Sequence, residues 1–490
     1  MYRSHVLVCG GTGCTSSGSQ QIMETLKEEI KKAGLEKEVS VVQTGCHGLC
    51  ALGPIMIVYP DAAFYSMVKV EDIPESRKEQ LPTGQIRLTA KTAHPGAVIK
   101  TLIEKNKSPK IATLPTFTGG LVGYFSYDYI KYSEPTLKLD AEDQEHFKDV
   151  DLMLFDKVIA YDNYRQKIVL MINIETENLE ENYEKAVQEL EKMEELIRFG
   201  KPAETKAGHL KSEFRPLFDE KAYCEKVEQV KHYIHEGDLF QLVLSNRLEA
   251  DFEGSLLDTY RVLRTTNPSP YMFYFSSDDV EIAGASPETL VKVEDGEVRT
   301  FPLAGTRPRG KSYEEDQRLE KELLADEKER AEHNMLVDLG RNDLGKICDF
   351  GTVEVEKYMS IERYSHVMHI GSTVKGQLRK DKTAVDAIDS VLPAGTLSGA
   401  PKLRACQIIN ELENNKRGIY GGAIGYLDFT GNMDTCIAIR LAFKKNGKVF
   451  VRSGAGIVAD SVPEKEHQEC INKAKAVMVA LAEAEGGSNL

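Results

Sequence analysis

The chain has 490 residues, 41% of them hydrophobic and 28% charged, which is the composition of a soluble globular protein with roughly two to four domains. Its net charge of −15 argues against nucleic acid or an anionic membrane as a general partner, although local groups can still bind small anions. No apolar run approaches the roughly 18 residues that span a bilayer and the N-terminus lacks the apolar core of a signal peptide, so we expect a cytoplasmic protein whose cysteines are thiols or metal ligands.

Residues 1–75 alternate between short apolar strands and one amphipathic helix. The predicted order is a strand over HVLVC, a helix over SQQIMETLKEEIKKAG, a second strand over VSVVQTG, and a hairpin formed by PIMIVYP and FYSMVKV. This order predicts a small α/β domain that is complete in itself. Residues 76–92 are polar and contain Pro82 and Gly84, so we interpret them as a linker or junction.

Residues 93–490 are interpreted as one large α+β unit, because strand and helix patterns mix to the end without a fixed-period repeat. Helices are predicted over PGAVIKTLIEKNK, over residues 178–199 and over FDEKAYCEKVEQVKHYIHEGD. The segment VDLMLFDKVIAYDNYRQKIVLMINI predicts paired strands. Residues 313–341 are charge-dense, but their apolar residues return at helical spacing, which predicts a single helix.

Four of the nine cysteines lie on two glycine-rich loops. Cys9 and Cys14 follow the first predicted strand, and Cys46 and Cys50 follow the second. If the two strands lie side by side, both loops leave the sheet at one edge and the four thiols can converge. Four thiolates suit an iron–sulfur cluster or a structural zinc, and the spacing favours [2Fe–2S]; unliganded thiols are the alternative. The other five cysteines are expected to be buried small residues.

The string VLVCGGTGCTSSGSQ, followed by TGCHGLCALGPIMIVYP, resembles a known domain. It is similar to the thioredoxin-like [2Fe–2S] domain that begins the flavoprotein subunits of electron-bifurcating hydrogenases and NADH dehydrogenases. The resemblance covers about residues 3–75 and implies that the four cysteines are the cluster ligands. The FMN- and NADH-binding domain that normally follows is not found in this chain.

Two pairs of acidic residues have helical spacing in the C-terminal part of the chain. Glu329 and Glu332 lie three residues apart in DEKERAEHNMLVDLGRND, and Glu466 and Glu469 repeat that spacing in DSVPEKEHQECINKAKA. Two such pairs form a set of hard oxygen ligands suited to Mg²⁺. The alternative is that they are solvated helix faces, which is the usual fate of such pairs.

Further unusual residues surround these acids in the sequence. The turns PLAGTRPRG, PAGTLSGAPK and RSGAGIVADS are rich in glycine, and their N–H groups could bind carboxylates. Arg440 is predicted to lie in the apolar strand TCIAIRLAF, where a buried cation needs a carboxylate partner that a ligand can supply. His369 and Lys473 add a titratable group and a second cation.

Together these segments closely resemble the chorismate-utilising enzymes, and within them the large subunits of anthranilate synthases, from about residue 93 to the end. The resemblance implies an α+β fold of antiparallel sheets flanked by helices, and a lyase that acts on chorismate. It also implies that Glu332 and Glu469 bind Mg²⁺, with Glu329 and Glu466 in support.

The same resemblance assigns roles around the substrate. Tyr420 and Arg440 would hold the enolpyruvyl carboxylate of chorismate, and Lys473 would be the basic residue near the metal. His369 would lie beside the ring, and Glu288 in GASPE would be the general acid for the departing C4 hydroxyl. The turns that would contact the substrate contain Gly305, Thr306, Thr396, Gly454 and Gly456.

Two positions select among family members by their chemistry. Relatives that make isochorismate or salicylate activate water with a lysine where this chain has Gln241, and a neutral amide cannot deprotonate water. The commonest aminodeoxychorismate synthases carry a nucleophilic lysine where this chain has Ala304, which cannot form the covalent adduct. Both positions favour attack of ammonia at C2 of chorismate and loss of pyruvate, which gives anthranilate in the first step of tryptophan biosynthesis.

No part of the chain is left over for a Cys-His-Glu glutaminase once the lyase is accounted for. The resemblance therefore implies a separate glutamine amidotransferase subunit that delivers ammonia, and hence a hetero-oligomer. Two alternatives stay open: an aminodeoxychorismate synthase-like enzyme, and an iron–sulfur redox or regulatory protein with a non-catalytic lyase-like domain.

The family normally begins with a segment resembling LLES that forms half of a feedback site for tryptophan, and that segment is not found here. The other half, NPSPYMFY, is present, so Pro270, Tyr271 and Met272 are expected to line a residual tryptophan site. The iron–sulfur-like domain stands in place of the missing segment. Three accounts are open: a natural fusion in which redox state modifies control, an engineered or mis-assembled join of two genes, which we favour, and a structural role for residues 1–75.

Overall fold

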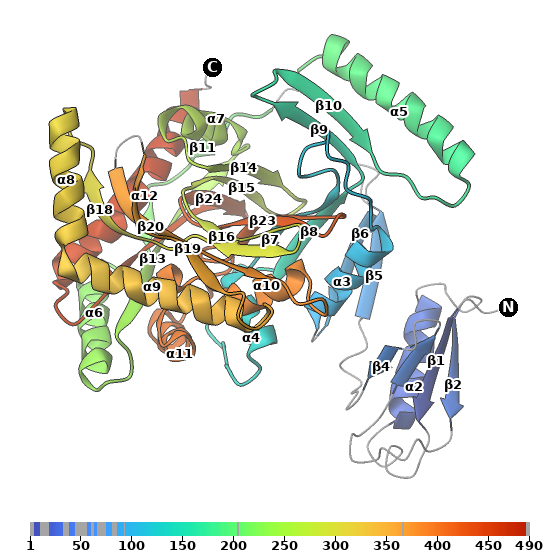
Figure 1. The fold of residues 1–490 in the computed structure, drawn as a ribbon, viewed down its shortest axis with the longest axis horizontal. Helices are drawn as coiled ribbons and strands as arrows, with labels where there is room; N and C mark the ends of the chain where they lie inside the picture. Colours follow the sequence, from blue (N-terminus) through green and yellow to red (C-terminus); the bar gives the residue numbers. More distant parts are fainter. Residues whose placement is uncertain are drawn as a thin grey trace. The chain divides into compact units, whose positions relative to one another are not determined.

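The computed structural model describes residues 4–9, 19–32, 39–44, 56–59, 63–65, 75–80, 86–92, 94–202, 205–364 and 367–486. The chain forms two compact units, Met1–Val98 and Ile99–Leu490 (Figure 1). Within the described parts of the chain, no helix is long and apolar enough to cross a membrane.

The first unit contains the strand–helix–strand–hairpin order that the sequence predicts. Its four-stranded sheet has the order β2-β1-β3-β4, with β1 and β2 parallel and β3 antiparallel to β1. Ile22 of the connecting helix is buried, and Lys31 and Lys32 in its last turn complement the helix dipole. The elements are β1 (Ser4–Cys9), α2 (Ser19–Lys32), β2 (Val39–Thr44), β3 (Met56–Tyr59) and β4 (Ala63–Tyr65).

The stretch expected to be a linker contains two further strands. β5 (Glu75–Gln80) and β6 (Ile86–Lys91) pair antiparallel, with Glu75 opposite Lys91. β5, ESRKEQ, is entirely polar and gives no local strand signal, whereas β6, IRLTAK, alternates between apolar and polar residues as a strand does.

The second unit is built on two mostly antiparallel sheets. The eight-stranded sheet contains β11 (His209–Leu210), β12 (Arg215–Pro216), β13 (Gln241–Glu253), β14 (Tyr271–Ser276), β15 (Glu281–Ser286), β21 (Gly399–Ala400), β24 (Leu441–Lys445) and β25 (Lys448–Ile457). The nine-stranded sheet contains β7 (Gly120–Phe125), β8 (Val150–Phe155), β16 (Thr289–Glu294), β17 (Glu297–Thr300), β18 (Leu303–Pro308), β19 (Glu354–Arg363), β20 (Val367–Gln377), β22 (Ala423–Asp428) and β23 (Met433–Ile437). β9 (Lys157–Asp162) and β10 (Lys167–Ile172) form a separate pair, which leaves β8 to join β7.

One apolar core lies between the two sheets. It joins Tyr124 and Cys436 from the nine-stranded sheet to Ile282, Phe443 and Phe450 from the eight-stranded sheet, all buried. Phe443 and Phe450 stack with their ring centroids 5.1 Å apart. The sheets therefore face each other as a sandwich.

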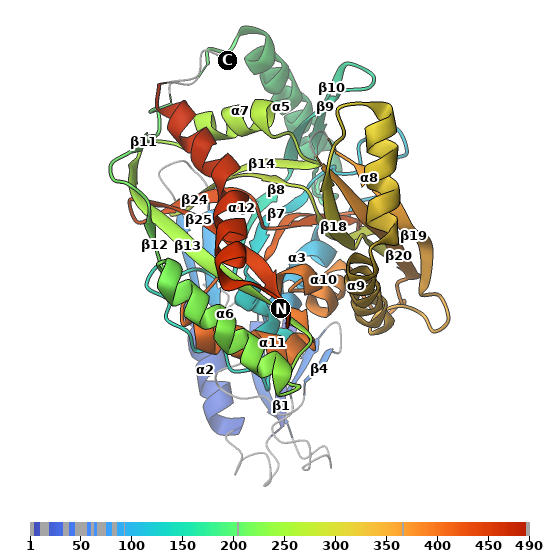
Figure 2. The ribbon, with the colours of Figure 1, turned by 90° about the vertical axis from the view of Figure 1, so that its left-hand side faces the viewer.

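Helices cover the outer faces of this sandwich (Figures 1 and 2). α9 and α10 pack on the nine-stranded sheet, while α6, α7, α11 and α12 pack on the eight-stranded sheet. Figure 2 shows α6 and α12 side by side. The helices are α3 (Pro95–Lys105), α4 (Ile130–Ser133), α5 (Leu179–Phe199), α6 (Glu220–His235), α7 (Leu257–Thr266), α8 (Tyr313–Ala325), α9 (Glu327–Gly345), α10 (Ala384–Val391), α11 (Lys402–Glu413) and α12 (Pro463–Glu483), with short 3₁₀ helices at Tyr127–Tyr129, Gly395–Leu397 and Ala484–Gly486.

The prediction of one helix over residues 313–341 is wrong, because the chain breaks between α8 and α9 at Asp326. Asp326 is extended, with φ −71° and ψ 109°, and its carboxylate accepts hydrogen bonds from the N–H groups of Lys328 and Glu329 at 3.1 and 3.2 Å. It is therefore the N-cap of α9. The break sets the direction of α9, which carries Glu329 and Glu332.

Candidate active site

The floor of the candidate site is formed by β13 and β25, which pair antiparallel with Val243 opposite Gly456. Gln241, the first residue of β13, donates from Nε2 to Oε1 of Glu332 on α9 at 3.2 Å. A Cβ atom at position 456 would lie 2.7 Å from that Nε2 atom. Glycine at this position therefore leaves the Gln241 amide room to reach Glu332.

Gly454, two residues earlier on β25, is the meeting point of two further side chains. Lys473 of α12 donates from Nζ to its carbonyl oxygen at 3.1 Å and forms an ion pair with Glu469 at 2.7 Å. A Cβ atom on Gly454 would lie 3.1 Å from the hydroxyl of Tyr420. Tyr420 is buried, and burial raises the pKa of its hydroxyl, so the phenol stays neutral and can donate a hydrogen bond.

The two predicted acid pairs lie on α9 and α12. Burial raises the pKa of Glu332, and the charge of Glu329 raises it further. Burial likewise raises the pKa of Glu466, and the charge of Glu469 adds to that effect. In each pair the charge of one carboxylate thus disfavours the ionised form of its more deeply buried neighbour, Glu332 or Glu466.

Cations partly balance these acids. The charges of Lys328 and Lys473 lower the pKa of Glu332 and of Glu466, so both lysines lie near both helices' acids. Across the parts of the chain that the structure describes, no three His, Cys, Asp or Glu side chains are grouped closely enough to hold a metal ion as they stand. The donor set itself, carboxylates raised in pKa by their neighbours and offset by lysine, suits a hard divalent cation.

Glu288 has the most clearly perturbed carboxyl group of the site. The Glu288 residue as a whole is half-buried, but its carboxyl group is surrounded by protein atoms. The resulting desolvation raises the pKa of the carboxyl group to about 7. Thr396 opposes this shift by donating from Oγ1 to Glu288 Oε1 at 3.2 Å, as do the charges of Arg440 and Lys473. Near neutral pH this carboxyl group is therefore poised to give up or take up a proton.

Arg440 is not in a strand, contrary to the prediction. It lies between β23 and β24 with φ at 51°, a left-handed conformation that breaks the apolar run and turns the side chain out of the sheet pattern. Burial lowers the pKa of its guanidinium, and the charge of Glu288 opposes that effect. The guanidinium makes no hydrogen bond or ion pair with any residue in the described part of the chain, which leaves its donors available to a ligand.

His369 on β20 is held by the turn that interrupts β18. Nδ1 lies 2.9 Å from the carbonyl oxygen of Gly305 and 3.1 Å from Oγ1 of Thr306. Because a carbonyl can only accept, Nδ1 must carry the hydrogen and Nε2 keeps its lone pair. Gly305 has φ at 66°, where the register between β18 and β20 shifts. Burial lowers the pKa of His369, so the ring is neutral at neutral pH.

Electrostatic influence connects these groups into one site. The charge of Arg440 acts on both Glu288 and His369, and the charge of Lys473 acts on both Glu288 and Glu332. The structure thus brings together predicted residues from the eight-stranded sheet, the nine-stranded sheet, α9 and α12.

The residues of the predicted tryptophan site lie on or next to β14, and one of them contacts the sequence neighbour of Glu288. Tyr271 begins β14, and its hydroxyl lies 2.8 Å from Oγ1 of Thr289 and 2.8 Å from Oδ1 of Asp434. Met272 accepts a hydrogen bond on Sδ from the N–H of Ser269 at 3.3 Å. Thr289 follows Glu288 in sequence, so β14 reaches the candidate site through this neighbour. Pro270 precedes β14 in the segment leading to it.

The predicted cluster ligands are only partly within the described residues. Cys9 ends β1 and stands opposite Thr44, the last residue of β2, in the parallel register. The prediction that the two strands lie side by side is confirmed, so both cysteine-bearing segments begin at the same edge of the sheet. Cys14, Cys46 and Cys50 lie outside the described residues.

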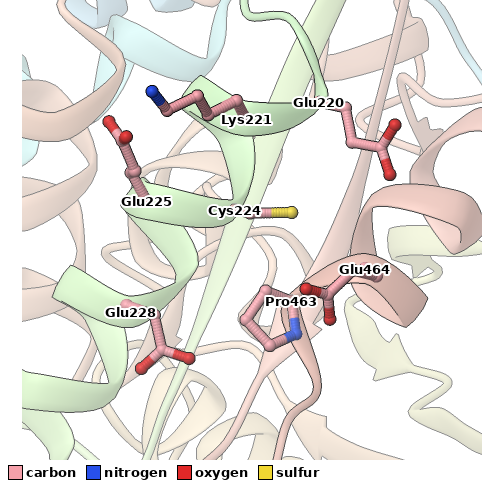
Figure 3. A pocket seen from close by; sticks show the side chains of 7 residues that line it. All are labelled: Glu220, Lys221, Cys224, Glu225, Glu228, Pro463 and Glu464. Atoms are coloured by element: carbon pink, nitrogen blue, oxygen red, sulfur yellow. The ribbon is translucent and has the colours of Figure 1, made fainter.

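A surface hollow lies apart from these residues. It measures about 570 Å³ and lies between α6 and the start of α12. Figure 3 shows Cys224 pointing from α6 across the hollow, with glutamates around it. Burial and three nearby glutamates raise the pKa of the Cys224 thiol, so it is a poor nucleophile. The lining residues are Glu220, Lys221, Cys224, Glu225, Glu228, Pro463 and Glu464.

Sequence reasoning missed three charged residues beneath the site. Glu413 forms ion pairs with both Arg417 and Arg452, and each of the three side chains is 1% exposed. Arg417 lies three residues before Tyr420, and Arg452 lies two before Gly454. Arginines placed next to functional turns are the signal that could have identified them.

Comparison with known proteins agrees with this geometry. Residues 67–479 match the family model of chorismate binding enzymes, and residues 1–77 match that of thioredoxin-like [2Fe-2S] ferredoxins. The chain is 49% identical to anthranilate synthase component 1 of Acetivibrio thermocellus over 399 residues, which cover 80% of this chain and 81% of the relative. It is 48% identical to the same component of Aquifex aeolicus, with 80% of each chain covered.

Solved structures place the fold in the same group. Anthranilate synthase component I from Streptococcus pneumoniae TIGR4 is 39% identical with a TM-score of 0.70, and the match covers 83% of this chain and 90% of that chain. The menaquinone-specific isochorismate synthase of Escherichia coli is 23% identical with a TM-score of 0.63, covers 84% of this chain and 89% of that chain, and shares the fold. The predicted α+β fold of antiparallel sheets flanked by helices is confirmed. The chain belongs to the chorismate-binding enzyme family and, within it, to the group of anthranilate synthase component 1.

Proposed function

We propose that this chain is the synthase component of an anthranilate synthase, which converts chorismate and ammonia to anthranilate and pyruvate in tryptophan biosynthesis. The observation that carries the proposal is Gln241, a neutral amide 3.2 Å from Glu332 in a chain whose relatives are anthranilate synthases. A neutral amide cannot take a proton from water, so the nucleophile must arrive as an amine that is already reactive.

Arg440 and Tyr420 are the proposed partners of the enolpyruvyl carboxylate of chorismate. The guanidinium of Arg440 makes no ion pair within the described chain, and the neutral hydroxyl of Tyr420 can add a hydrogen bond. Lys473 supplies a further positive charge next to Gly454. Gly305 and Thr306 lie on β18, and Gly454 and Gly456 lie on β25, rather than in the predicted turns; we propose that all four line the chorismate site. A Cβ atom on the three glycines would crowd Glu329, Tyr420 and Gln241 respectively.

Glu288 is the proposed general acid. With a pKa of about 7 it holds a proton on part of the molecules at neutral pH, which it can give to the C4 hydroxyl as ammonia attacks C2 and water leaves. Loss of the C2 proton and cleavage of the bond between C3 and the enolpyruvyl oxygen then release pyruvate and leave an aromatic ring. The unprotonated Nε2 of neutral His369 is suited to accept a proton in this second step.

Glu332 and Glu469, supported by Glu329 and Glu466, are proposed to hold Mg²⁺. When bound, the ion would offset the ring carboxylate of chorismate and stabilise the charge that develops as the hydroxyl leaves. Glu469 also forms an ion pair with Lys473 at 2.7 Å.

Residues 1–77 are proposed to carry a [2Fe–2S] cluster on Cys9, Cys14, Cys46 and Cys50, because they match the thioredoxin-like [2Fe-2S] ferredoxin model. We retain the boundaries 1–75, 76–92 and 93–490 for the small domain, the junction and the catalytic domain. A separate glutamine amidotransferase subunit is the proposed source of ammonia, which makes the working enzyme a hetero-oligomer in the cytoplasm.

The test is the ammonia-dependent appearance of anthranilate fluorescence with the purified chain, chorismate and Mg²⁺. We expect Glu332→Ala to lower this rate by about 10²-fold or more, because it removes a half-buried carboxylate that is proposed to hold Mg²⁺. Glu327→Ala, which removes an exposed carboxylate from the same helix, is the matched control and should keep the wild-type rate.

An active Glu332→Ala variant would refute the assignment of Glu332. A wild-type chain that consumes chorismate and ammonia without forming anthranilate would refute the proposed reaction and favour an aminodeoxychorismate product, which liquid chromatography of the same mixture separates.

A further inference from the structure

Beneath the candidate site lies a charged cluster that the proposed reaction does not use. Glu413 ends α11, Arg417 follows it by four residues, and Arg452 comes from β25. The Arg417–Glu413 and Arg452–Glu413 ion pairs are 2.6 and 2.7 Å long, and each of the three side chains is 1% exposed. Charges buried this deeply persist only when hydrogen bonds satisfy them.

Glu413 is satisfied by five donors. It accepts from Nε and Nη2 of Arg417, from Nη2 of Arg452, and from the N–H and hydroxyl of Ser245, at distances between 2.6 and 2.9 Å. Burial alone would raise the pKa of Glu413, but the charges of Arg417 and Arg452 outweigh it and lower the pKa. Two cations thus share one anion, and the cluster keeps a net positive charge.

The remaining donors of Arg417 reach two segments of the site. Nη1 donates to the carbonyl oxygen of Leu397 at 2.6 Å, and Leu397 follows Thr396. Nη2 donates to the carbonyl oxygen of Val243 at 2.7 Å, two residues after Gln241. The guanidinium therefore joins the turn that contacts Glu288 to the strand that carries Gln241.

The same guanidinium lies against aromatic rings. It is 4.6 Å from the ring centroid of Tyr127 and 5.8 Å from that of Tyr420. The charge of Arg417 also acts on the Tyr420 hydroxyl, opposing the rise in its pKa that burial causes. Arg417 thus contacts the ring of a proposed substrate-binding residue from behind.

Arg452 completes the arrangement from β25. Its Nε donates to Ser245 Oγ at 2.8 Å, and its Nη1 donates to Asn415 Oδ1 at 3.0 Å. Arg452 lies two residues before Gly454, so the cluster also fixes the strand that approaches the substrate.

We propose that Glu413, Arg417 and Arg452 position the chorismate-binding surface, and that Arg417 is a positioning residue acting through Tyr420. The inference rests on the proposed function. Each guanidinium nitrogen of Arg417 and Arg452 has a hydrogen-bond partner. The cluster therefore ties together the segments that carry Tyr420, Thr396, Gln241 and Gly454. Its surplus positive charge also favours an anionic substrate above it.

The test is Arg417→Lys in the ammonia-dependent assay. Lysine keeps the charge but has one nitrogen in place of the planar fork, so it cannot serve Glu413, Leu397 and Val243 together. We expect KM for chorismate to rise about tenfold while kcat changes less than about threefold, because loosened positioning weakens substrate binding before it affects proton transfer.

Arg247→Lys is the matched control. Arg247 is a buried arginine on the same strand as Gln241 and stands opposite Arg452 in the register of β13 and β25. Its side chain pairs with Glu249 at 2.9 Å and lies 5.0 Å from the ring centroid of Phe450, but within the described residues it makes no hydrogen bond or ion pair with Glu413 or Tyr420. Arg247→Lys should lower Tm about as much as Arg417→Lys does, without changing KM for chorismate. Equal KM for wild type, Arg417→Lys and Arg247→Lys would overturn the proposal.

A double-mutant cycle separates positioning from a general loss of stability. In the background of Tyr420→Phe, Arg417→Lys should raise KM much less than tenfold, whereas Arg247→Lys should behave additively. Additive effects of Arg417→Lys and Tyr420→Phe would overturn the claim that Arg417 acts through Tyr420.

If Arg417→Lys does not fold, Asn415→Ala answers the same question, because it removes one bond to Arg452 without stranding a charge. It should raise KM by about threefold, and an unchanged KM would overturn the proposal. A wild-type chain without ammonia-dependent activity would instead refute the proposed function, so the two failures are distinguishable.

Discussion

The pKa of Glu288 depends both on the burial of its own carboxyl group and on a hydrogen bond from Thr396. Desolvation raises the pKa of Glu288, and the hydroxyl of Thr396 holds it down by donating to the ionised carboxylate at 3.2 Å. A general acid is most effective when its pKa lies near the working pH. The resulting pKa of about 7 meets that condition.

Replacing Thr396 with valine should therefore move the pH dependence of the reaction. Loss of the hydrogen bond destabilises the ionised form of Glu288, so its pKa rises above 7 and the acid stays protonated to higher pH. We expect the alkaline limb of kcat/KM to shift upward by roughly one pH unit. The measurement is a pH profile at a constant concentration of neutral ammonia.

Thr383→Val is the control for that profile, because Thr383 also donates to a carboxylate, Asp386, at 2.9 Å but caps α10 rather than serving the site. Its alkaline limb should coincide with that of the wild type. A limb that Thr396→Val leaves in place would show that Glu288 is not the acid being titrated.

At the scale of single residues, short motifs predicted the site better than composition did. Glu332, His369 and Tyr420 stand in strings that the family resemblance made recognisable. Arg417 stands in NKRGIYGG, where a basic pair next to asparagine is typical of an exposed turn. Arg417 is buried because its guanidinium donates to the carbonyl oxygens of Leu397 and Val243, which are distant in the chain, so its place beside the motif of Tyr420 is the one local signal.

Among the helices and strands, the boundary between α8 and α9 depends on a cap and on a tertiary contact that periodicity does not reveal. Apolar periodicity continues through residues 313–341, which is why one helix was predicted. Asp326 followed by Glu329 is nevertheless the spacing of an N-cap signal. The cap prevails because Asp326 also pairs with Arg307 at 2.9 Å, a contact across the fold that sequence periodicity does not contain.

Asp326→Ala should loosen the first turn of α9. The N–H groups of Lys328 and Glu329 lose their acceptor, which costs about 1 kcal/mol and lets that turn open about fivefold more often. Hydrogen–deuterium exchange of peptides from the start of α9 measures this directly. Asp326→Asn keeps a capping oxygen and should exchange much more slowly than the alanine variant; equal exchange in the two variants would contradict the capping role.

The pairing of strands could be predicted from the sequence only where the two strands are neighbours along the chain. The hairpin of β3 and β4 and the pair β9–β10 follow from neighbouring strand patterns. β7 instead pairs with β22, which places Gly123 opposite Gly425. A contact between segments so far apart leaves no local signature, so the sequence could predict antiparallel sheets flanked by helices but not their strand order.

The whole molecule combines two units that match two different families. The model of thioredoxin-like [2Fe-2S] ferredoxins covers residues 1–77, and that of chorismate binding enzymes begins at residue 67. Every residue of the candidate active site belongs to Ile99–Leu490, and every proposed cluster ligand belongs to Met1–Val98. The chemistry of either unit can therefore be removed while the other is measured.

Cys46→Ser makes that separation testable. Anaerobically purified wild-type chain should absorb broadly in the visible range and bleach with dithionite, because residues 1–77 match the model of thioredoxin-like [2Fe-2S] ferredoxins and four cysteine thiolates suit such a cluster. The variant should lose this absorbance while its ammonia-dependent rate of anthranilate formation stays at the wild-type value, since no active-site residue lies in that unit.

Cys224→Ser, which changes a thiol of the other unit, should retain both the absorbance and the rate. A colourless or zinc-containing wild-type protein would exclude the cluster. A coloured wild type whose Cys46→Ser variant is bleached and also slow would show that the cluster controls the lyase, and the two units could then no longer be treated as chemically independent.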